Sequence, residues 1–431
     1  MKITVHRGGE EIGGNCIELQ SGDSRILLDY GTPLPKIDPA TGENIEIPYE
    51  QAKLNIPGLY PGTSPRLDGL IISHTHQDHY GMLFGPQINQ ELPVYMTRIM
   101  EAMVRITGKM TPKRAEFTAN INYFMKEVPF TVGVFKITPY LMDHSASESF
   151  AFLIEAEGKR VIYTGDYRAH GHRTHAFQRF LNAQMGPIDL ILTEGTQAGV
   201  EKGDDEKKVM ADIAGMITPQ TGTIYVLCAG QNIDLLCSLA GIAVQKGRFL
   251  AVDGYIALVL ETIKTMAAEQ DIPLKIPGMD SDYLKVLDTK TMFSLRKYYP
   301  EAAARVSQKL VSWDWVTANL QKLIVPVRTY SRYWVNEHIR DFSNALFVYS
   351  QWEGYKEEAE LREALEWFKK RGMDAHSNHV SGHAYFSTIR KLIDSKNPRH
   401  IIPIHTEHPE IFQKAFGYKV HVLKNGGGFE I

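Results

Sequence analysis

The sequence predicts an α/β protein in which one domain is inserted into another. Up to about residue 199, short apolar strands alternate with glycine turns, and several strands end at an ionisable residue. From 200 to 355, strand-like and helix-like segments alternate, which is typical of a parallel sheet with flanking helices. From 356 to 431, histidines return with the same chemistry as those near the start of the chain. We therefore expect the first domain to resume at 356.

The first domain is expected to contain mostly short strands. They are predicted at 3–6, 16–19, 25–28, 70–72, 93–96, 135–142, 150–155, 161–163 and 189–192, with a helix at 99–107. A loop from about 32 to 65 carries many prolines and glycines. Loops of this length are often functional, so this one is a candidate wall or lid of a site.

The inserted domain is expected to alternate regularly between helix and strand. Helices are predicted at 204–216, 232–245 and 257–269, and strands at 223–227 and 248–252. A further helix at 356–370 would lead back into the first domain.

Composition limits the class of protein. The 431 residues are 43% hydrophobic and 23% charged, with a net charge of −3, so no overall basic field indicates a nucleic-acid partner. Three cysteines are too few for a disulfide scaffold and favour a reducing, cytoplasmic location. No apolar run reaches membrane-spanning length, and we expect no membrane partner.

The strongest local signal is the segment 73–81, where His74, His76, Asp78 and His79 fall within six positions after an apolar strand. In an extended backbone, His74 and His76 leave on the same side, Asp78 is in phase with them, and a bend at 77–79 would let His79 join. Imidazole and carboxylate groups are ligands for zinc or a similar divalent metal. Four such side chains are hard to explain as packing, because burying them without partners would be costly.

Three further residues follow apolar strands in the same way: His144, Asp166 and His405. Each would be a weak signal alone. Together with the first four they make seven candidate ligands, about the number that two neighbouring metal ions need when one carboxylate bridges them.

In order, these residues resemble the motif series of the metallo-β-lactamase superfamily. Glu194-Gly195-Thr196 resembles motif A of its β-CASP branch, the segment His379 to Ala384 resembles motif B, and His405 resembles motif C. That branch includes ribonuclease J, the cleavage-and-polyadenylation endonuclease and Artemis-like DNA nucleases. The resemblance runs from Gly8 to His405 and implies an αββα sandwich (1–199 and 356–431) interrupted by a β-CASP α/β domain (200–355).

The resemblance also implies a role for each residue. One zinc would be held by His74, His76 and His144, the other by Asp78, His79 and His405, and both by Asp166; manganese is the alternative metal. Asp78, His383 and Glu194 are counted as catalytic, with His383 as general acid and Glu194 as its partner. His379 and Ser381 would contact substrate phosphate, and Asp29 would support the ligands from behind.

The implied function is hydrolysis of RNA phosphodiester bonds by a hydroxide that two zinc ions activate, in RNA processing or decay. Histidine at motif C favours single-stranded RNA as substrate, with endonuclease and 5′-exonuclease action both open. The alternatives are a DNA nuclease, an inactive nucleic-acid-binding homologue and a hydrolase of small esters or phosphoesters. A homodimer is one expected assembly. Because the sequence ends at Ile431, the additional C-terminal domain of ribonuclease J is expected to be absent.

Several weaker features leave two readings open. The segment 228–232 is either a phosphate-holding loop or an ordinary turn between strand and helix. His170, His172 and His175 are expected in a solvated loop rather than in contact with substrate. Tyr330, Tyr333, Trp334 and Trp352 could stack on bases, but their apolar context favours the core.

Overall fold

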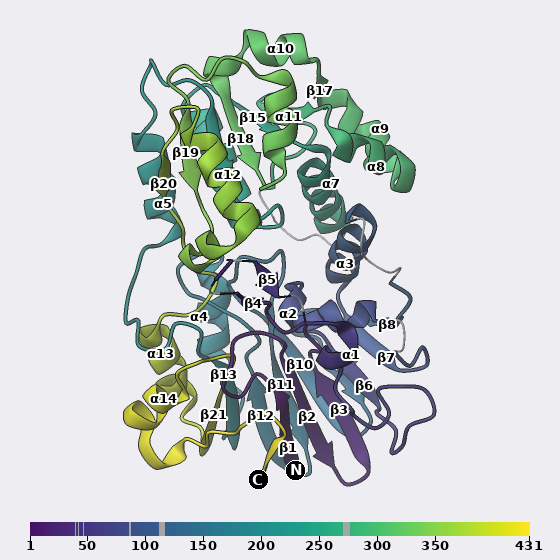
Figure 1. The fold of residues 1–431 in the computed structure, drawn as a ribbon. Helices are drawn as coiled ribbons and strands as arrows, with labels where there is room; N and C mark the ends of the chain where they lie inside the picture. The colour runs from purple at the N-terminus through teal and green to yellow at the C-terminus, as the bar shows by residue number, and fades with distance from the viewer. Residues whose placement is uncertain (39, 42, 46, 86–87, 112–116, 270–275) are drawn as a thin grey trace.

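Two β-sheets packed face to face form the lower half of the molecule in Figure 1, and a third sheet with its helices forms the upper half. We call these halves the sandwich and the cap. The computed structural model describes residues 1–38, 40–41, 43–45, 47–85, 88–111, 117–269 and 276–431.

The first sheet of the sandwich has the strand order β22-β1-β2-β3-β6-β7-β8. Its strands are β1 (Lys2–Arg7), β2 (Cys16–Ser21), β3 (Ser24–Leu28), β6 (Gly69–Ile71), β7 (Pro93–Met96), β8 (Asn120–Tyr123) and β22 (Gly427–Glu430). Because β22 pairs antiparallel with β1, the two ends of the chain meet at the bottom of the sandwich, where the Met1 ammonium donates to the Ile431 carbonyl at 3.1 Å (Figure 1).

The second sheet has the order β21-β13-β12-β11-β10-β9. Its strands are β9 (Phe130–Val132), β10 (Phe135–Leu141), β11 (Phe150–Ala156), β12 (Lys159–Tyr163), β13 (Leu190–Glu194) and β21 (His400–Ile404). The last three run parallel to one another, so their carboxyl ends lie at one edge of the sheet. That edge faces the cap.

Both faces of this sheet are covered, as the sequence of β11 shows. Phe150, Phe152 and Ile154 point into the core between the two sheets, whereas Ala151 and Leu153 point to the opposite face. That outer face is covered by α4 (Thr174–Asn182), α13 (Phe386–Lys396) and α14 (Pro409–Phe416). A strand buried on both faces reads as a continuous apolar run, as this one does. The expected αββα sandwich is confirmed.

The cap is an all-parallel sheet in the order β17-β16-β15-β18-β14-β19-β20 with helices on both faces. Its strands are β14 (Ile224–Leu227), β15 (Phe249–Val252), β16 (Leu284–Leu287), β17 (Leu310–Val311), β18 (Leu323–Val327), β19 (Leu346–Tyr349) and β20 (Ala375–Ser377). One face carries α5 (Glu206–Gly215), α6 (Ile233–Gln245), α7 (Gly254–Glu269), α8 (Lys290–Tyr298) and α9 (Pro300–Val306); the other carries α10 (Trp313–Ala318), α11 (Ser331–His338) and α12 (Ala359–Lys369). The βαβα pattern thus folds as expected.

The cap sheet continues beyond residue 355, where the sequence places the end of the inserted domain. Helix α12 buries Leu361 and Phe368 against it, and β20 pairs with β19. In this pairing, His376 of β20 lies opposite Val348 of β19. Strand β20 has little apolar character of its own, and all three of its residues are exposed. We therefore propose that the insertion extends to about residue 377.

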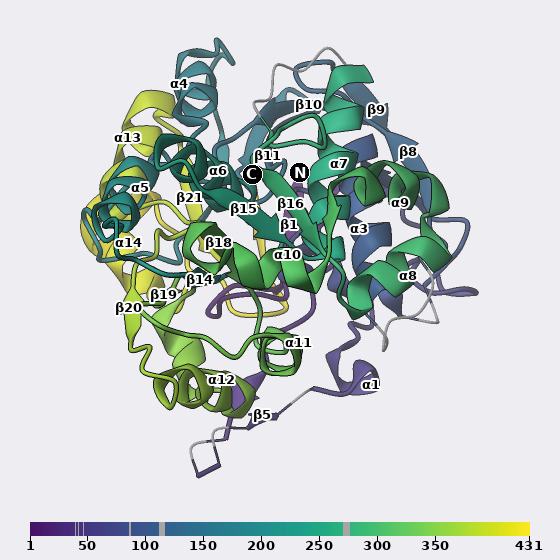
Figure 2. The ribbon, with the colours of Figure 1, turned by 90° about the horizontal axis from the view of Figure 1, so that it is seen from above.

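Helix α3 (Arg98–Met110) joins the two halves. Its Met100 and Val104 belong to the sandwich core, and its Ile99, Met103 and Ile106 belong to the core of the cap. Seen from above, α3 lies beside α7 and below α8 and α9 of the cap (Figure 2).

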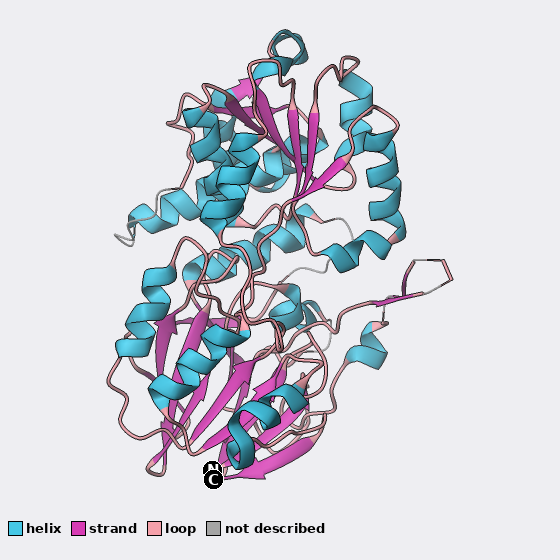
Figure 3. Ribbon diagram, turned by 90° about the vertical axis from the view of Figure 1, so that its left-hand side faces the viewer, coloured by secondary structure: helices cyan, strands magenta, loops and turns pink. Residues whose placement is uncertain are grey.

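The loop predicted from 32 to 65 contains a small hairpin that projects from the side of the molecule (Figure 3). Its strands are β4 (Lys36–Ile37) and β5 (Asn44–Ile45), and α1 (Tyr49–Ala52) follows. The Arg362 guanidinium of the cap donates to the Thr41 carbonyl, so this hairpin contacts the cap.

The remaining elements are short: α2 (Gln77–Tyr80) and the 3₁₀ turns η1 (Gly81–Phe84), η2 (Ser307–Lys309), η3 (Leu320–Lys322), η4 (Glu353–Glu357) and η5 (Gly417–Lys419). None of the helices in the part of the chain that the structure describes has the length and apolar character needed to cross a lipid bilayer.

Candidate metal centre

The predicted ligands come from strand ends that meet below the cap. His74 and His76 lie in the loop after β6, and Asp78 and His79 lie on α2 directly after it. His144, Asp166 and His405 follow β10, β12 and β21. The extended backbone expected through Asp78 is wrong, because α2 begins at Gln77. The bend expected at 77–79 is present as this helical turn, and it brings His79 toward the other ligands.

The structure places these side chains within reach of shared metal ions. The ligand atoms of His74, His76, His144 and Asp166 all lie within 4.8 Å of one another, and those of Asp78, His79 and His405 form a second such group. The Asp166 Oδ2 lies 3.6, 3.2 and 3.7 Å from the Nε2 atoms of His74, His79 and His405. Asp166 therefore stands between the two groups.

Several of these atoms are buried without a hydrogen-bond partner among the described residues. They are the Nε2 atoms of His74, His79 and His405 and both carboxylate oxygens of Asp166. A buried polar atom without a partner costs about 1–3 kcal/mol, and five in one place need an explanation. Divalent cations bound between imidazole nitrogens and a carboxylate would satisfy all five, so these residues fit a two-metal site.

Burial also keeps the imidazoles of His74, His76 and His144 in the form that binds metal. It lowers the pKa of His74 and His144 well below the usual value, and neighbouring imidazoles lower it further. Burial lowers the pKa of His76 to about 4, although the carboxylates of Asp78 and Asp166 oppose it. Neutral imidazole is the ligand form of histidine.

Asp29 holds the ligands from behind. Its carboxylate accepts from the Ser73 backbone N–H, the Ser73 hydroxyl and the Tyr163 hydroxyl at 2.7, 2.7 and 2.5 Å, and lies 2.7 Å from the His79 Nδ1. A proton on that Nδ1 leaves Nε2 free to face Asp166. Asp29 has φ 60° and His405 has φ 52°, a left-handed conformation that costs about 1–3 kcal/mol in a residue other than glycine and is common at functional sites.

His383 and Glu194 meet on the cap side of the cluster. The His383 Nδ1 lies 3.4 Å from the Glu194 Oε2 and 3.6 Å from the Asp166 Oδ2. Glu194 is fully buried and accepts from the Ala384 and Thr196 backbone N–H groups at 2.9 and 3.1 Å. Burial lowers the pKa of His383, but the carboxylates of Glu194 and Asp166 outweigh this and raise it to about 9.

The two predicted substrate contacts differ in their surroundings. His379 is partly exposed, and burial lowers its pKa to about 4. The Ser381 hydroxyl accepts from the His383 backbone N–H at 3.1 Å and from the Gln197 amide at 3.3 Å, so it already shapes the loop that carries His383.

The sequence analysis missed a buried ionic junction beside the cluster. Arg168, two residues after Asp166, is fully buried and pairs with Glu206 and Asp234 of the cap at 3.0 and 2.5 Å. Arg173 lies 3.5 Å from the same Asp234 and donates to the His144 carbonyl. The sequence contains no distinct signal for this junction, because two arginines that follow a strand resemble any charged surface loop.

The loop with three histidines is therefore not simply solvated, as the sequence favoured. The His170 ring stacks on Tyr385 at 4.3 Å and its Nε2 lies 3.0 Å from the Ser381 carbonyl. The His172 Nε2 lies 2.8 Å from the Ser238 hydroxyl of the cap. His172 and His175 are nevertheless both exposed, as the sequence predicts for this loop.

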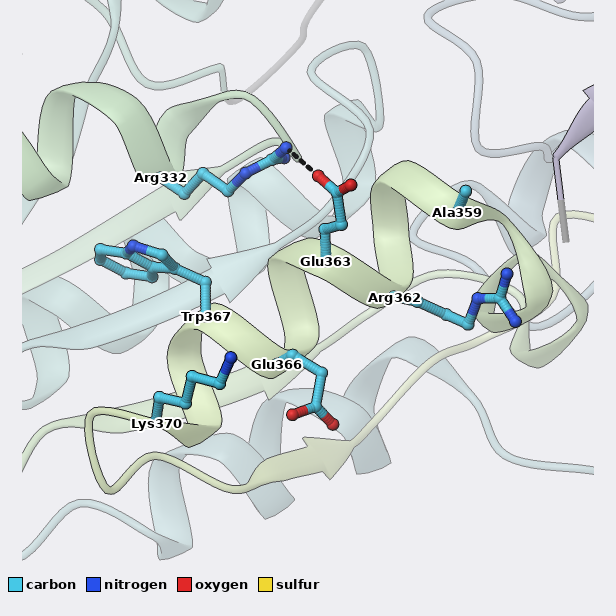
Figure 4. A pocket seen from close by; sticks show the side chains of 7 residues that line it. All are labelled: Arg332, Ala359, Arg362, Glu363, Glu366, Trp367 and Lys370. Carbon is cyan, nitrogen blue, oxygen red and sulfur yellow. Dashed lines mark hydrogen bonds and ion pairs between the residues drawn. The ribbon is translucent and has the colours of Figure 1, made fainter. Parts of the chain in front are cut away.

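A groove of about 570 Å³ on the cap lies along α12, apart from these ligands. Figure 4 shows its lining of mixed charge, in which the Arg332 guanidinium pairs with the Glu363 carboxylate at 2.8 Å. Its lining residues are Arg332, Ala359, Arg362, Glu363, Glu366, Trp367 and Lys370. None of them is a predicted ligand, so the groove is not the metal centre.

Comparison with protein families agrees with this geometry. Residues 36–221 match a β-lactamase superfamily domain, and residues 360–423 match a Zn-dependent metallo-hydrolase RNA specificity domain. The chain is 22% identical to ribonuclease J of Mycoplasma genitalium over 420 residues, which is 94% of this chain and 68% of that protein. It is also 22% identical to ribonuclease J of Helicobacter pylori strain B128, covering 95% of this chain and 56% of that protein.

The chain is similar to ribonuclease J and carries matches to a β-lactamase superfamily domain and an RNA specificity domain. Among solved structures, a protein of unknown function from Enterococcus faecalis V583 has the same fold, with a TM-score of 0.75 and 18% identity over 100% of this chain and 99% of that one. The ribonuclease J-like chain spans between about half and two thirds of the length of the curated relatives named above.

Proposed function

We propose that this protein is a metal-dependent ribonuclease that hydrolyses phosphodiester bonds of single-stranded RNA. The observation that carries the proposal is the convergence of six metal-type ligands around Asp166, with the His383–Glu194 pair beside them. The RNA specificity domain matched by residues 360–423 and the ribonuclease J relatives favour RNA over DNA as substrate.

In this proposal, His74, His76 and His144 hold one zinc ion, Asp78, His79 and His405 hold the other, and Asp166 bridges both. Two metal ions at these positions would neutralise charge on the phosphate and lower the pKa of bound water. Manganese could serve in place of zinc. Of the two proposed carboxylate ligands, Asp78 is more exposed than Asp166: 17% of its side chain is exposed, against 1% for Asp166. It therefore stands nearest to an incoming phosphate.

The protein's own acid is His383. Glu194 is fixed by two backbone N–H groups and holds the imidazole through Nδ1, which leaves Nε2 to donate a proton to the leaving oxygen. The pKa of about 9 keeps His383 protonated at neutral pH. The His383 Nδ1 lies 3.6 Å from the Asp166 Oδ2, so the acid would act where the phosphate would be held.

His379 and Ser381 are proposed to contact substrate phosphate from the same loop. The three cysteines of the sequence are all unpaired, which is compatible with the cytoplasmic location expected from the sequence. The homodimer stays a prediction that light scattering would check.

The test is cleavage of end-labelled RNA and DNA strands that carry a 5′-phosphate, a 5′-triphosphate or a 5′-hydroxyl. We expect RNA cleavage that a chelator abolishes and that Zn²⁺ or Mn²⁺ restores. Internal fragments would indicate an endonuclease, and mononucleotides from 5′-phosphorylated RNA would indicate a 5′-exonuclease. Preferential cleavage of DNA would support the DNA nuclease alternative, and no cleavage by metal-loaded protein would support an inactive binding protein.

A further inference from the structure

Two aromatic side chains of the cap remain accessible in a segment that the metal centre does not use. Trp352 and Tyr355 lie at η4, between β19 and α12, and are 56% and 39% exposed. The sequence places Trp352 in the core, and the structure shows this to be wrong. Large aromatic groups left in water at a defined position need a reason, because their burial would be favourable.

Their position connects them to the loop of His379, Ser381 and His383. Strand β19 ends at Tyr349, whose carbonyl accepts from the Asn378 backbone N–H at 2.9 Å. The Lys356 ammonium donates to the Ser377 hydroxyl at 2.8 Å. In parallel α/β sheets, ligands bind beyond the carboxyl ends of the strands, and η4 lies there. Segment η4 therefore lies beside the loop that carries His379, Ser381 and His383.

The indole of Trp352 is held in a defined orientation by a glycine. A Cβ added at Gly354 would lie 2.2 Å from two atoms of the Trp352 six-membered ring. The ring therefore lies directly over the Gly354 backbone. The Tyr355 ring meets it edge to face at 5.4 Å and 88°. An arrangement fixed by backbone contact loses little side-chain entropy when a flat ligand stacks on it.

The neighbouring cation, the Lys356 ammonium, already has partners within the protein. Lys356 pairs with Glu353 at 2.6 Å, and its ammonium lies over the Tyr349 ring at 4.6 Å. The segment thus offers aromatic surface with balanced charge, which suits a nucleobase better than a phosphate.

We propose that Trp352 and Tyr355 form a stacking site for one base of an RNA strand held at the metal centre. This inference rests on the proposed ribonuclease function. The site recognises the flat face of a base, so it distinguishes single-stranded from paired RNA with little preference for sequence.

The experiment measures binding of a single-stranded RNA of about 12 nucleotides by fluorescence anisotropy, with all proteins in a His383→Ala background to prevent cleavage. A series of the same RNA carries one abasic nucleotide at successive positions. We expect one position at which base removal weakens binding about tenfold. Trp352→Ala should raise the Kd of the intact RNA about tenfold and remove the abasic effect at that position.

Gly354→Ala is the informative second variant, because it keeps both aromatic side chains and displaces the indole. It should reproduce the effect of Trp352→Ala, whereas Trp352→Phe should retain most of the affinity. Tyr418→Ala is the matched control, since Tyr418 is 91% exposed on η5 of the sandwich and should leave the Kd unchanged. The loss in Trp352→Ala should be similar at about 50 and 200 mM salt, unlike the loss of a phosphate contact.

An unchanged Kd in Trp352→Ala, or a flat abasic profile in the parent protein, would overturn the stacking site even if RNA is cleaved. Full affinity in Gly354→Ala would overturn the glycine-held orientation. Failure of the metal-loaded wild-type protein to bind or cleave RNA would instead overturn the proposed function. Circular dichroism melting confirms that each variant is folded.

Discussion

The Asp166 carboxylate is the residue on which the candidate site is centred. Its Oδ2 lies within 3.7 Å of the imidazole nitrogens of His74, His79 and His405, which follow the ends of β6 and β21, and neither oxygen has a hydrogen-bond partner among the described residues. Burial raises the pKa of this carboxyl, but the imidazoles of His405 and His79 outweigh it and keep the pKa well below the usual range. Asp166 is therefore an anion surrounded by ligand atoms.

Replacing Asp166 with alanine should lower the metal content. Without the bridging carboxylate, each remaining group keeps three neutral or singly charged ligands, and the two ions would repel one another without an anion between them. We expect elemental analysis of purified Asp166→Ala to find less than half of the wild-type metal. Asp212→Ala is the control, because Asp212 is exposed on α5. Full metal content in Asp166→Ala would contradict the bridging role.

His383→Ala should separate catalysis from metal binding. A general acid typically contributes about 10²–10⁴-fold, so turnover should fall by that factor while the metal content stays at the wild-type level. The comparison is needed because the His383 ring nitrogens also lie within 4.8 Å of ligand atoms of Asp166 and His405. Loss of metal from His383→Ala would make His383 a ligand rather than the acid.

At the scale of single residues, the candidate ligands are easier to find in the sequence than the buried charges beside them. His74, His76, Asp78 and His79 stand out because metal-type residues crowd into six positions. Arg168 and Arg173 do not stand out, since their role depends on carboxylates of the cap far away in the chain. Contacts between distant segments leave no local pattern to read.

Strands β1, β2 and β3 are cross-linked by charged side chains on one face of the first sheet. Glu18 of β2 is 2.8 Å from the His6 Nε2 of β1 and accepts from Arg25 of β3 at 2.7 and 3.1 Å. Burial raises the pKa of Glu18, but the hydrogen bonds from His6 and Arg25 outweigh this and lower it to about 2. The three strands thus share one buried carboxylate.

This lowered pKa predicts a pH dependence of stability. The unfolded chain binds a proton at Glu18 near pH 4.5, whereas the folded protein binds it near pH 2. The contribution is therefore present above pH 4.5 and lost as the pH falls toward 2, with a size of up to about 2 kcal/mol. We expect urea unfolding of chelator-treated protein to show this loss in the wild type and not in Glu18→Gln. Parallel pH profiles would contradict the assignment.

Helix α3 shows what periodicity can and cannot predict for an element. Its apolar positions predict a helix at 99–107, and the structure has one at Arg98–Met110, capped by the Thr97 hydroxyl. The division of those positions between the sandwich core and the cap core is not visible in the pattern, because both cores select the same residue types. Strand β20 was missed for the opposite reason, since its residues are exposed and polar.

The sandwich and the cap are joined by a buried junction of two arginines of the sandwich, Arg168 and Arg173, and two carboxylates of the cap, Glu206 and Asp234. Asp234, in the first turn of α6, pairs with Arg168 at 2.5 Å and lies 3.5 Å from Arg173. Burial raises the pKa of Asp234, but the guanidinium groups of Arg173 and Arg168 outweigh this and lower it. Arg173 also donates to the His144 carbonyl, and Arg168 donates to the Ser381 carbonyl. The junction therefore connects the cap to two segments of the candidate metal centre.

Asp234→Asn should therefore weaken both the junction and the metal site. Removing one partner of a buried ion pair typically costs about 3–5 kcal/mol, because the remaining charges stay buried. We expect the free energy of unfolding to fall by about 3 kcal/mol and chelators to remove metal faster. Asp212→Asn, which breaks an exposed pair with Lys208, should change stability by less than about 1 kcal/mol. Equal stability of the two variants would contradict a junction role for Asp234.

The pairing of β22 with β1 determines where extra sequence can be attached. Both chain ends leave the sandwich side by side, at the end remote from the cap (Figure 1). A reporter, a purification handle or a fused protein placed at either end would thus point away from an arriving polynucleotide. A short peptide bridging Ile431 and Met1 would also allow the polypeptide to be reopened elsewhere as a circular permutant.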